Sequence, residues 1–161
     1  MQSRRGVVLL MLVMSLSGCA ARQKTITNLP AGVTMAQAQD WDAAVAKLHE
    51  IASVTSTVRS TVISLNHQGL FPDSNAYATT LTIIGKVDQL QLAASAILKQ
   101  TPGIFTDSTR AQVKDYLQQI SQQLVQLNTE GLTGIKNASN QQKVVALVAE
   151  ITAAVTLILS L

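Results

Sequence analysis

Few residues of this chain have a type and spacing that could support chemistry. Cys19 is the only cysteine, and it closes an apolar run near the start of the sequence. His49 and His67 lie about 27 Å apart along one expected helix, at about 1.5 Å per residue, so they cannot share a metal ion or a proton. Asp40 and Asp42 lie on different sides of that helix, near its start, where negative charge complements the helix dipole. We therefore expect no catalytic, cofactor-binding or metal-binding residue, and Cys19 is the one candidate site.

The residues before Cys19 have the arrangement of an export leader. Arg4 and Arg5 lie in a short basic segment, and residues 6–16 form an uncharged, mostly apolar run. That run has the length of a signal-peptide core and is shorter than the roughly 20 residues that span a bilayer. Leu16-Ser17-Gly18-Cys19 then resembles the lipobox of bacterial lipoproteins. This resemblance implies cleavage between Gly18 and Cys19, a diacylglycerol on the cysteine sulfur, and a further acyl chain on the new amino terminus.

The residue after the cysteine bears on which membrane holds the protein. Ala20 stands there rather than an aspartate, which resembles the outer-membrane sorting pattern of proteobacterial lipoproteins. Two or more acyl chains hold a protein stably to a membrane. We therefore expect a protein anchored in the outer membrane and facing the periplasm. Ser3-Arg4-Arg5 also resembles a twin-arginine export motif, but the residues that follow depart from it, and the ordinary export route is favoured.

Composition limits the remaining function classes. The full sequence has 12 basic and 9 acidic residues, and the leader carries Arg4 and Arg5, so the mature chain is nearly neutral. No basic patch remains that would indicate a nucleic-acid partner. Only 13% of the residues are charged and 3% are aromatic. An aliphatic core beneath a surface of Gln, Ser, Thr and Asn suits helix-on-helix packing.

The helical pattern predicts an all-α fold. Residues 1–18 are the expected signal peptide, 19–33 the lipidated N-terminus and a flexible tether, and 34–161 a single domain. Apolar residues recur in that domain at alternating three- and four-residue steps, which is typical of helices that pack nearly parallel or antiparallel. Short connections favour antiparallel neighbours, so we expect an up-down four-helix bundle. The expected helices cover about 34–67, 74–100, 107–130 and 139–160.

Helix ends and core positions follow from the same reading. Thr34-Met35-Ala36-Gln37 and Ser139-Asn140-Gln141-Gln142 resemble capping boxes, and Gly131 is the expected end of the third helix. The long first helix should extend beyond its neighbours. The expected core faces include Trp41 on the first helix, and Leu90 and Ile97 on the second.

The last helix carries two adjacent apolar stripes. One includes Val144, Ile151 and Ile158, and the other includes Val148 and Val155. The favoured interpretation is burial in the bundle, with the second stripe against the core or another copy of the chain. Insertion of residues 144–161 into a membrane is the alternative, although Glu150 would be costly in lipid.

These observations favour a non-enzymatic, lipid-anchored envelope protein that acts as a structural or protein-interaction module. The expected partners are the membrane, through the anchor, and an unidentified envelope protein, with homo-oligomerisation through the last helix also open. A carrier of an apolar ligand in the bundle core and a membrane-active protein are the alternatives.

Overall fold

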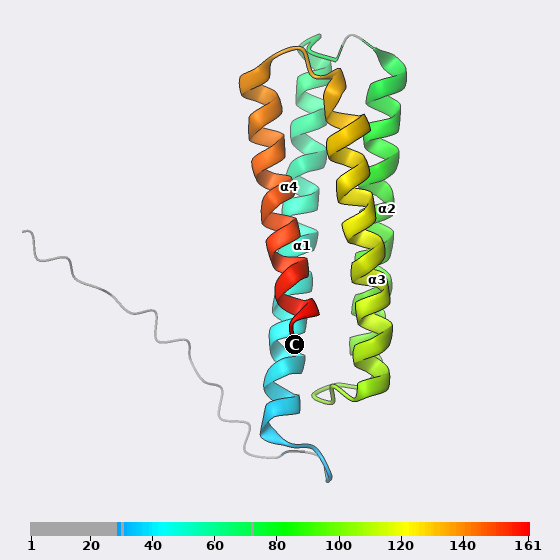
Figure 1. Ribbon diagram of the computed structural model, residues 1–161, viewed down its shortest axis with the longest axis vertical. Helices are drawn as coiled ribbons and strands as arrows, with labels where there is room; N and C mark the ends of the chain where they lie inside the picture. Colours follow the sequence, from blue (N-terminus) through cyan, green and yellow to red (C-terminus); the bar gives the residue numbers. More distant parts are fainter. Residues whose placement is uncertain (1–28, 30, 72) are drawn as a thin grey trace, which may run out of the picture.

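The computed structural model describes residues 29, 31–71 and 73–161 of the chain. Within that part, α1 (Met35–His67), α2 (Ser74–Gln100), α3 (Asp107–Gln126) and α4 (Ala138–Leu159) run alternately in opposite directions (Figure 1). The predicted all-α, up-down four-helix bundle is confirmed. The expected leader, the Gly18–Cys19 cleavage site and most of the expected tether lie outside the described residues.

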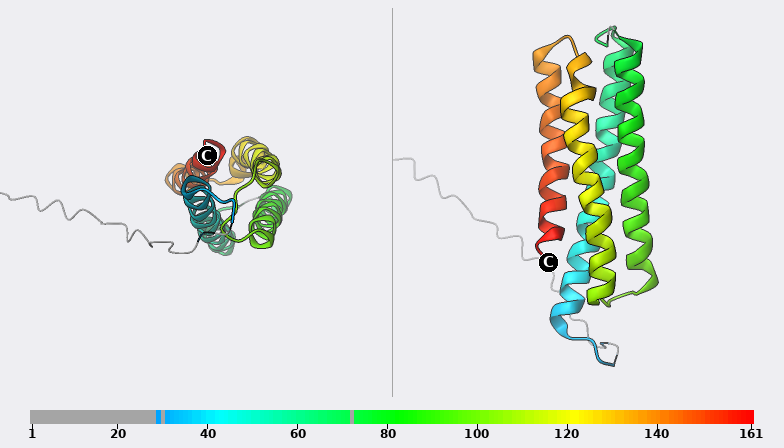
Figure 2. Two further views of the ribbon diagram at one scale, coloured as in Figure 1. Left: turned by 90° about the horizontal axis from the view of Figure 1, so that it is seen from below. Right: turned by 45° about the vertical axis from the view of Figure 1, so that its right-hand side comes forward.

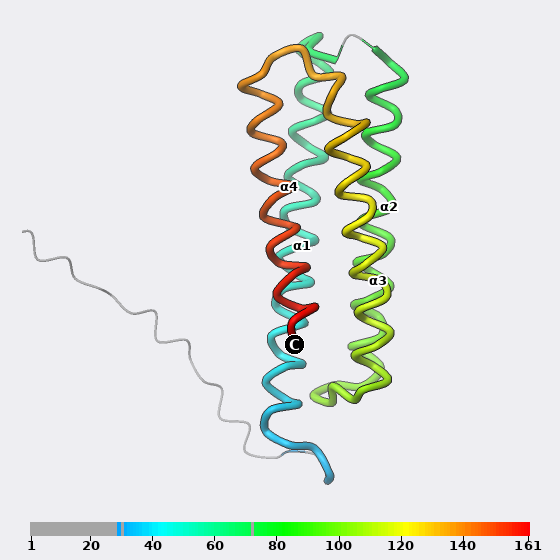
Figure 3. The backbone as a smooth tube through the Cα atoms, viewed as in Figure 1, coloured from blue at the N-terminus to red at the C-terminus, as the bar shows by residue number. Residues whose placement is uncertain are grey.

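Each helix packs against its neighbours in the sequence, and α4 closes the ring beside α1 (Figure 2). The most extensive contacts join α1 to α4 and α2 to α3, whereas α3 and α4 meet over a shorter stretch. The first helix has 33 residues and the last has 22. As predicted, α1 extends beyond its neighbours, and its first turns lie below the point where α4 ends (Figure 3).

The core is a continuous and largely aliphatic cluster contributed by all four helices and their connections, with Phe71 and Phe105 as its aromatic members. Its members recur at three- and four-residue steps because only those spacings keep side chains on one face of a helix. The most deeply buried polar side chains have hydrogen-bond partners: the Thr55 hydroxyl donates to the carbonyl of Ile51 at 2.7 Å, and that of Thr80 donates to the carbonyl of Gly131 at 2.9 Å. Burial of these groups is therefore compensated. The buried oxygens Thr101 Oγ1 and Gln123 Oε1 are the exceptions and have no partner within the described residues.

The N-terminal caps show where local chemistry determines a helix boundary. Thr34 forms the predicted capping box, accepting from the backbone N–H of Gln37 at 3.2 Å while Gln37 Oε1 accepts from the N–H of Thr34 at 3.0 Å. The prediction for α4 was wrong, because Asn137 is the cap. Its side-chain oxygen accepts from the N–H groups of Ser139 and Asn140, so Ser139 lies inside the first turn. The asparagine therefore caps the helix two residues earlier than the serine was expected to, and satisfies a different pair of backbone donors.

The end of α3 also differs from the prediction. A π-helical turn, η1 (Leu127–Gly131), and a 3₁₀ turn, η2 (Leu132–Gly134), follow α3. Gly131 has an ordinary helical φ of −71°, so it is not a left-handed helix stop. It is required by packing instead, since a Cβ there would lie 2.9 Å from Leu127 Cδ1 and 3.0 Å from Thr80 Oγ1.

The upper end of the bundle in Figure 1 is closed by two connections that contact each other. The backbone N–H of Lys136, after η2, donates to the carbonyl of Leu70, after α1, at 3.1 Å. Phe71, Leu132 and Ile135 are buried there. A Cβ on Gly134 would lie 2.7 Å from the Cβ of Ala76, so the second connection packs directly on α2.

The two apolar stripes of α4 are each buried in part. The core-facing residues come from both stripes and include Val144, Val148, Ile151 and Ile158, whereas Val145 is 42% exposed and Leu157 is 51% exposed. By length and composition alone, α2 and α4 could both cross a membrane. Both pack as bundle helices here, and membrane insertion stays a prediction with weak support.

Candidate functional site

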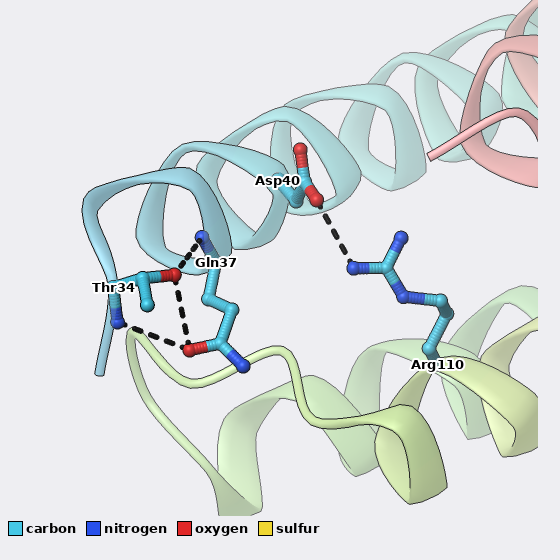
Figure 4. A network of polar contacts seen from close by, with 4 residues as sticks. All are labelled: Thr34, Gln37, Asp40 and Arg110. Atoms are coloured by element: carbon cyan, nitrogen blue, oxygen red, sulfur yellow. Dashed lines mark hydrogen bonds and ion pairs between the residues drawn. The ribbon is translucent and has the colours of Figure 1, made fainter. Parts of the chain in front are cut away.

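The lower end of the bundle, which the expected tether precedes, holds the most distinctive polar arrangement on the described surface. α4 ends before it reaches the first turns of α1. These turns therefore face the start of α3, and α4 does not lie beside them (Figure 3). Arg110 of α3 donates to Asp40 Oδ2 of α1 at 3.0 Å (Figure 4). The guanidinium of Arg110 also lies 4.7 Å from the centre of the buried Phe105 ring. Asp40 therefore joins two helices, a role that its position near a helix start did not indicate.

The apolar pattern of the first helix predicted Trp41 to lie within the core. This prediction was wrong, because Trp41 lies at the edge of the core. Its indole is half-buried and packs against the core cluster. Its Nε1 donates to the carbonyl of Leu98, near the end of α2, at 3.1 Å. A buried indole N–H needs such a partner, which fixes the side chain across the α1–α2 interface.

The core face of α2 is displaced by one residue in its second half. Gln91 and Leu98 are buried, whereas the predicted Leu90 and Ile97 are half-buried. The amide of Gln91 donates to the carbonyl of Leu48 at 3.1 Å and to the hydroxyl of Ser95 at 2.9 Å. A glutamine can occupy this interface because both partners are present, and a pattern of apolar residues cannot reveal such pairing.

Between these two interhelical contacts lies a groove of about 230 Å³. It was not predicted. Ser95 is small and half-buried, and the neighbouring Val45 also remains half-buried. The groove is lined by Trp41, Val45, Leu48, His49, Ser95, Leu98 and Lys99.

The predicted separation of the histidines holds. His49 and His67 are both exposed, near the middle and at the end of α1. Among the described residues, no three or more His, Cys, Asp or Glu side chains cluster closely enough to hold a metal ion.

The glutamines of α3 contribute to a more open surface between α2 and α3. Gln119, Gln122 and Gln123 lie beside Lys86 in a depression of about 260 Å³. Gln119 donates to Asp115 of its own helix. Gln122 is exposed, as expected of a solvated face, whereas Gln119 and Gln123 are half-buried.

Cys19, the predicted lipidation site, lies outside the described residues, so its modification stays a prediction. No protein-family model, curated protein or solved structure matches this chain.

Proposed function

We propose that this protein is held to the bacterial outer membrane by lipids on Cys19 and presents its four-helix bundle to the periplasm as a non-enzymatic structural or protein-interaction module. The observation that carries this proposal is the coincidence of a basic segment, an apolar run and Leu16-Ser17-Gly18-Cys19. Three acyl chains at one residue would anchor the chain stably, because stable anchoring needs more than one.

The bundle supports a scaffolding role better than a chemical one. The side chains of the lower end pair across helices: Asp40 binds Arg110, and Trp41 binds the carbonyl of Leu98. Such contacts brace helices against one another. The groups best able to act as bases, His49 and His67, are exposed on α1 and stand far apart.

The outward side of α4 offers a protein partner one apolar contact surface. Val145 and Leu157 are exposed there, with the small side chains Ala146, Ala149 and Ala153 also outward. Exposed apolar area of this kind marks contact surfaces when it is contiguous. We include a second copy of the chain among the proposed partners, to be tested by sedimentation of the wild-type chain and of Leu157→Lys.

The anchor is tested by mass spectrometry of the protein from fractionated envelopes. The expected N-terminal residue is Cys19 carrying diacylglycerol and an amide-linked acyl chain, in the outer-membrane fraction. Cys19→Ser should remove the lipid mass and release the protein from the membrane fraction. Gly18→Leu should block processing, whereas Gly18→Ala, which keeps a small residue before the cysteine, should not. An unmodified Cys19 on a soluble chain would overturn the proposal.

A further inference from the structure

The groove between α1 and α2 has apolar walls and defined ends. Its apolar lining residues are Trp41 and Val45, which are half-buried, and Leu48 and Leu98, which are buried beneath it. The hydrogen bond from Trp41 to Leu98 lies at one end of this lining, and the bonds from Gln91 to Leu48 and Ser95 involve lining residues toward the other end. These contacts tie the two helices together on both sides of the groove, so it is part of the packed structure.

The dimensions of the groove suit a short alkyl chain. An apolar cavity of about 150 Å³ holds benzene, so by proportion 230 Å³ holds about nine carbon atoms. On α1 the lining runs from Trp41 to His49, a distance of about 12 Å at about 1.5 Å per residue. A linear chain of nine or ten carbons has a similar length.

The charge at one end of the groove selects the head group. Lys99 lines the groove and follows Leu98, whose carbonyl accepts the hydrogen bond from Trp41. We therefore place Lys99 at the end of the groove where Trp41 lies. None of the ion pairs within residues 31–71 and 73–161 involves Lys99. Of the nearby acids on α1, Glu50 pairs with Lys47, and Asp42 does not line the groove. A carboxylate at this end would meet a cation that is available for pairing.

We propose that this groove binds a free medium-chain fatty acid, with its alkyl chain along Val45 and Leu48 and its carboxylate at Lys99. The ligand would cover Trp41 and Val45, which are otherwise half-exposed to water. This site lies on the described bundle and does not depend on lipid attachment at Cys19. The two proposals therefore fail separately.

Trp41 is the only tryptophan of the chain, so its fluorescence reports on the groove directly. The full 161-residue chain, made by cell-free synthesis so that Cys19 carries no lipid, would be kept in solution by an amphipathic polymer. Titration with straight-chain fatty acids, below their micelle concentrations, should shift the emission of Trp41 in a saturable way. Each added methylene should tighten binding up to about fourfold, corresponding to about 0.8 kcal/mol, until a plateau at about nine or ten carbons.

Two variants distinguish specific binding in the groove from unspecific partitioning of the ligand onto other apolar surfaces. Val45→Leu adds one methylene to the wall and should move the plateau about one carbon shorter. Lys99→Gln should weaken decanoate binding about threefold and leave decan-1-ol unchanged, since exposed ion pairs contribute up to about 1 kcal/mol. Lys86→Gln, an exposed lysine on the same helix, is the matched control and should change neither ligand. Circular dichroism of each variant would check that the helices are intact.

Three results would overturn the proposal. The first is an emission of Trp41 that does not respond to any of the acids. The second is an affinity that continues to rise beyond twelve carbons in both the wild type and Val45→Leu. The third is equal affinity for decanoate and decyltrimethylammonium, which would remove Lys99 as the selecting group.

Discussion

At the upper end of the bundle the connections between helices bury apolar side chains almost completely, whereas at the lower end partly exposed charged and aromatic side chains add contacts between helices. Leu132 and Ile135 pack beneath the upper connections, and two glycines allow the backbone to approach α2. Asp40, Trp41 and Arg110 hold the lower end. The upper end thus contributes stability through close packing, and the lower end keeps polar groups and a groove available for a ligand.

The largest expected effect is the loss of a packed side chain at the upper end. Leu132 is fully buried, so Leu132→Ala should lower the free energy of unfolding by about 2–5 kcal/mol through lost burial and a residual cavity. Urea denaturation followed by circular dichroism measures this change. The matched control is Leu92→Ala, because Leu92 is 63% exposed and its loss should change stability by less than about 0.5 kcal/mol. Equal effects at the two leucines would contradict the assignment of the core.

A smaller effect is expected where the upper connection approaches α2. Gly134→Ala should destabilise the fold by about 1–3 kcal/mol, because its new Cβ would lie 2.7 Å from the Cβ of Ala76, which cannot rotate away. Combining it with Ala76→Gly should recover part of that loss, and a double-mutant cycle measures the coupling. Additive effects of the two changes would show that the close approach is not what disfavours alanine.

At the lower end, Trp41→Phe should lower stability by about 1 kcal/mol, since it removes the donor to the carbonyl of Leu98 and some apolar contact. Thermal denaturation is the measurement. Tyr116→Phe is the control, because the half-buried Tyr116 donates no hydrogen bond within the described residues and its hydroxyl should be dispensable. A loss at Trp41 as large as that at Leu132 would mean that the two ends do not differ as described.

The smallest effect should come from the Asp40–Arg110 pair. Arg110→Gln is expected to cost about 1 kcal/mol or less, from the partly exposed ion pair and the contact with Phe105. The ionic part of this loss should diminish in 1 M salt, where the screening length is about 3 Å. Denaturation at low and high salt tests this, with Lys143→Gln on α4 as the control, because Lys143 forms no ion pair within the described residues. A loss of the same size in both salts would assign the effect to the ring contact alone.

The sequence predicted the fold well because helix periodicity and capping are local properties. Residues as far apart as Val58 and Ile158 could be placed in one core from their spacing alone, and the Thr34 capping box needed only four residues. The errors arose where a distant element decides the outcome. Gly131 was predicted to end the third helix and does end its π-helical turn, but its φ is ordinary, and the close approach of Thr80 on another helix could not be predicted.

The candidate site was less predictable for the same reason. The lipobox can be read directly from the sequence, but Cys19 lies outside the described residues and its modification stays a prediction. The groove depends on how α1 and α2 are rotated about their axes, which places Gln91 inside and Leu90 at the edge. Two features of the sequence could have indicated the groove: Trp41 has an apolar ring with a single N–H donor, and Ser95 has a small side chain. Neither feature specifies which residue of another helix lies beside it.

The hydrogen bond from Lys136 to Leu70 has a consequence for engineering this chain. It joins the loop of the first helical hairpin to that of the second. Residues inserted at either point should break this contact between the hairpins. The hydrogen bonds of the opposite turn, residues 101–106, stay within its own sequence neighbourhood. A circular permutant or split reporter should therefore be opened beside Gly103.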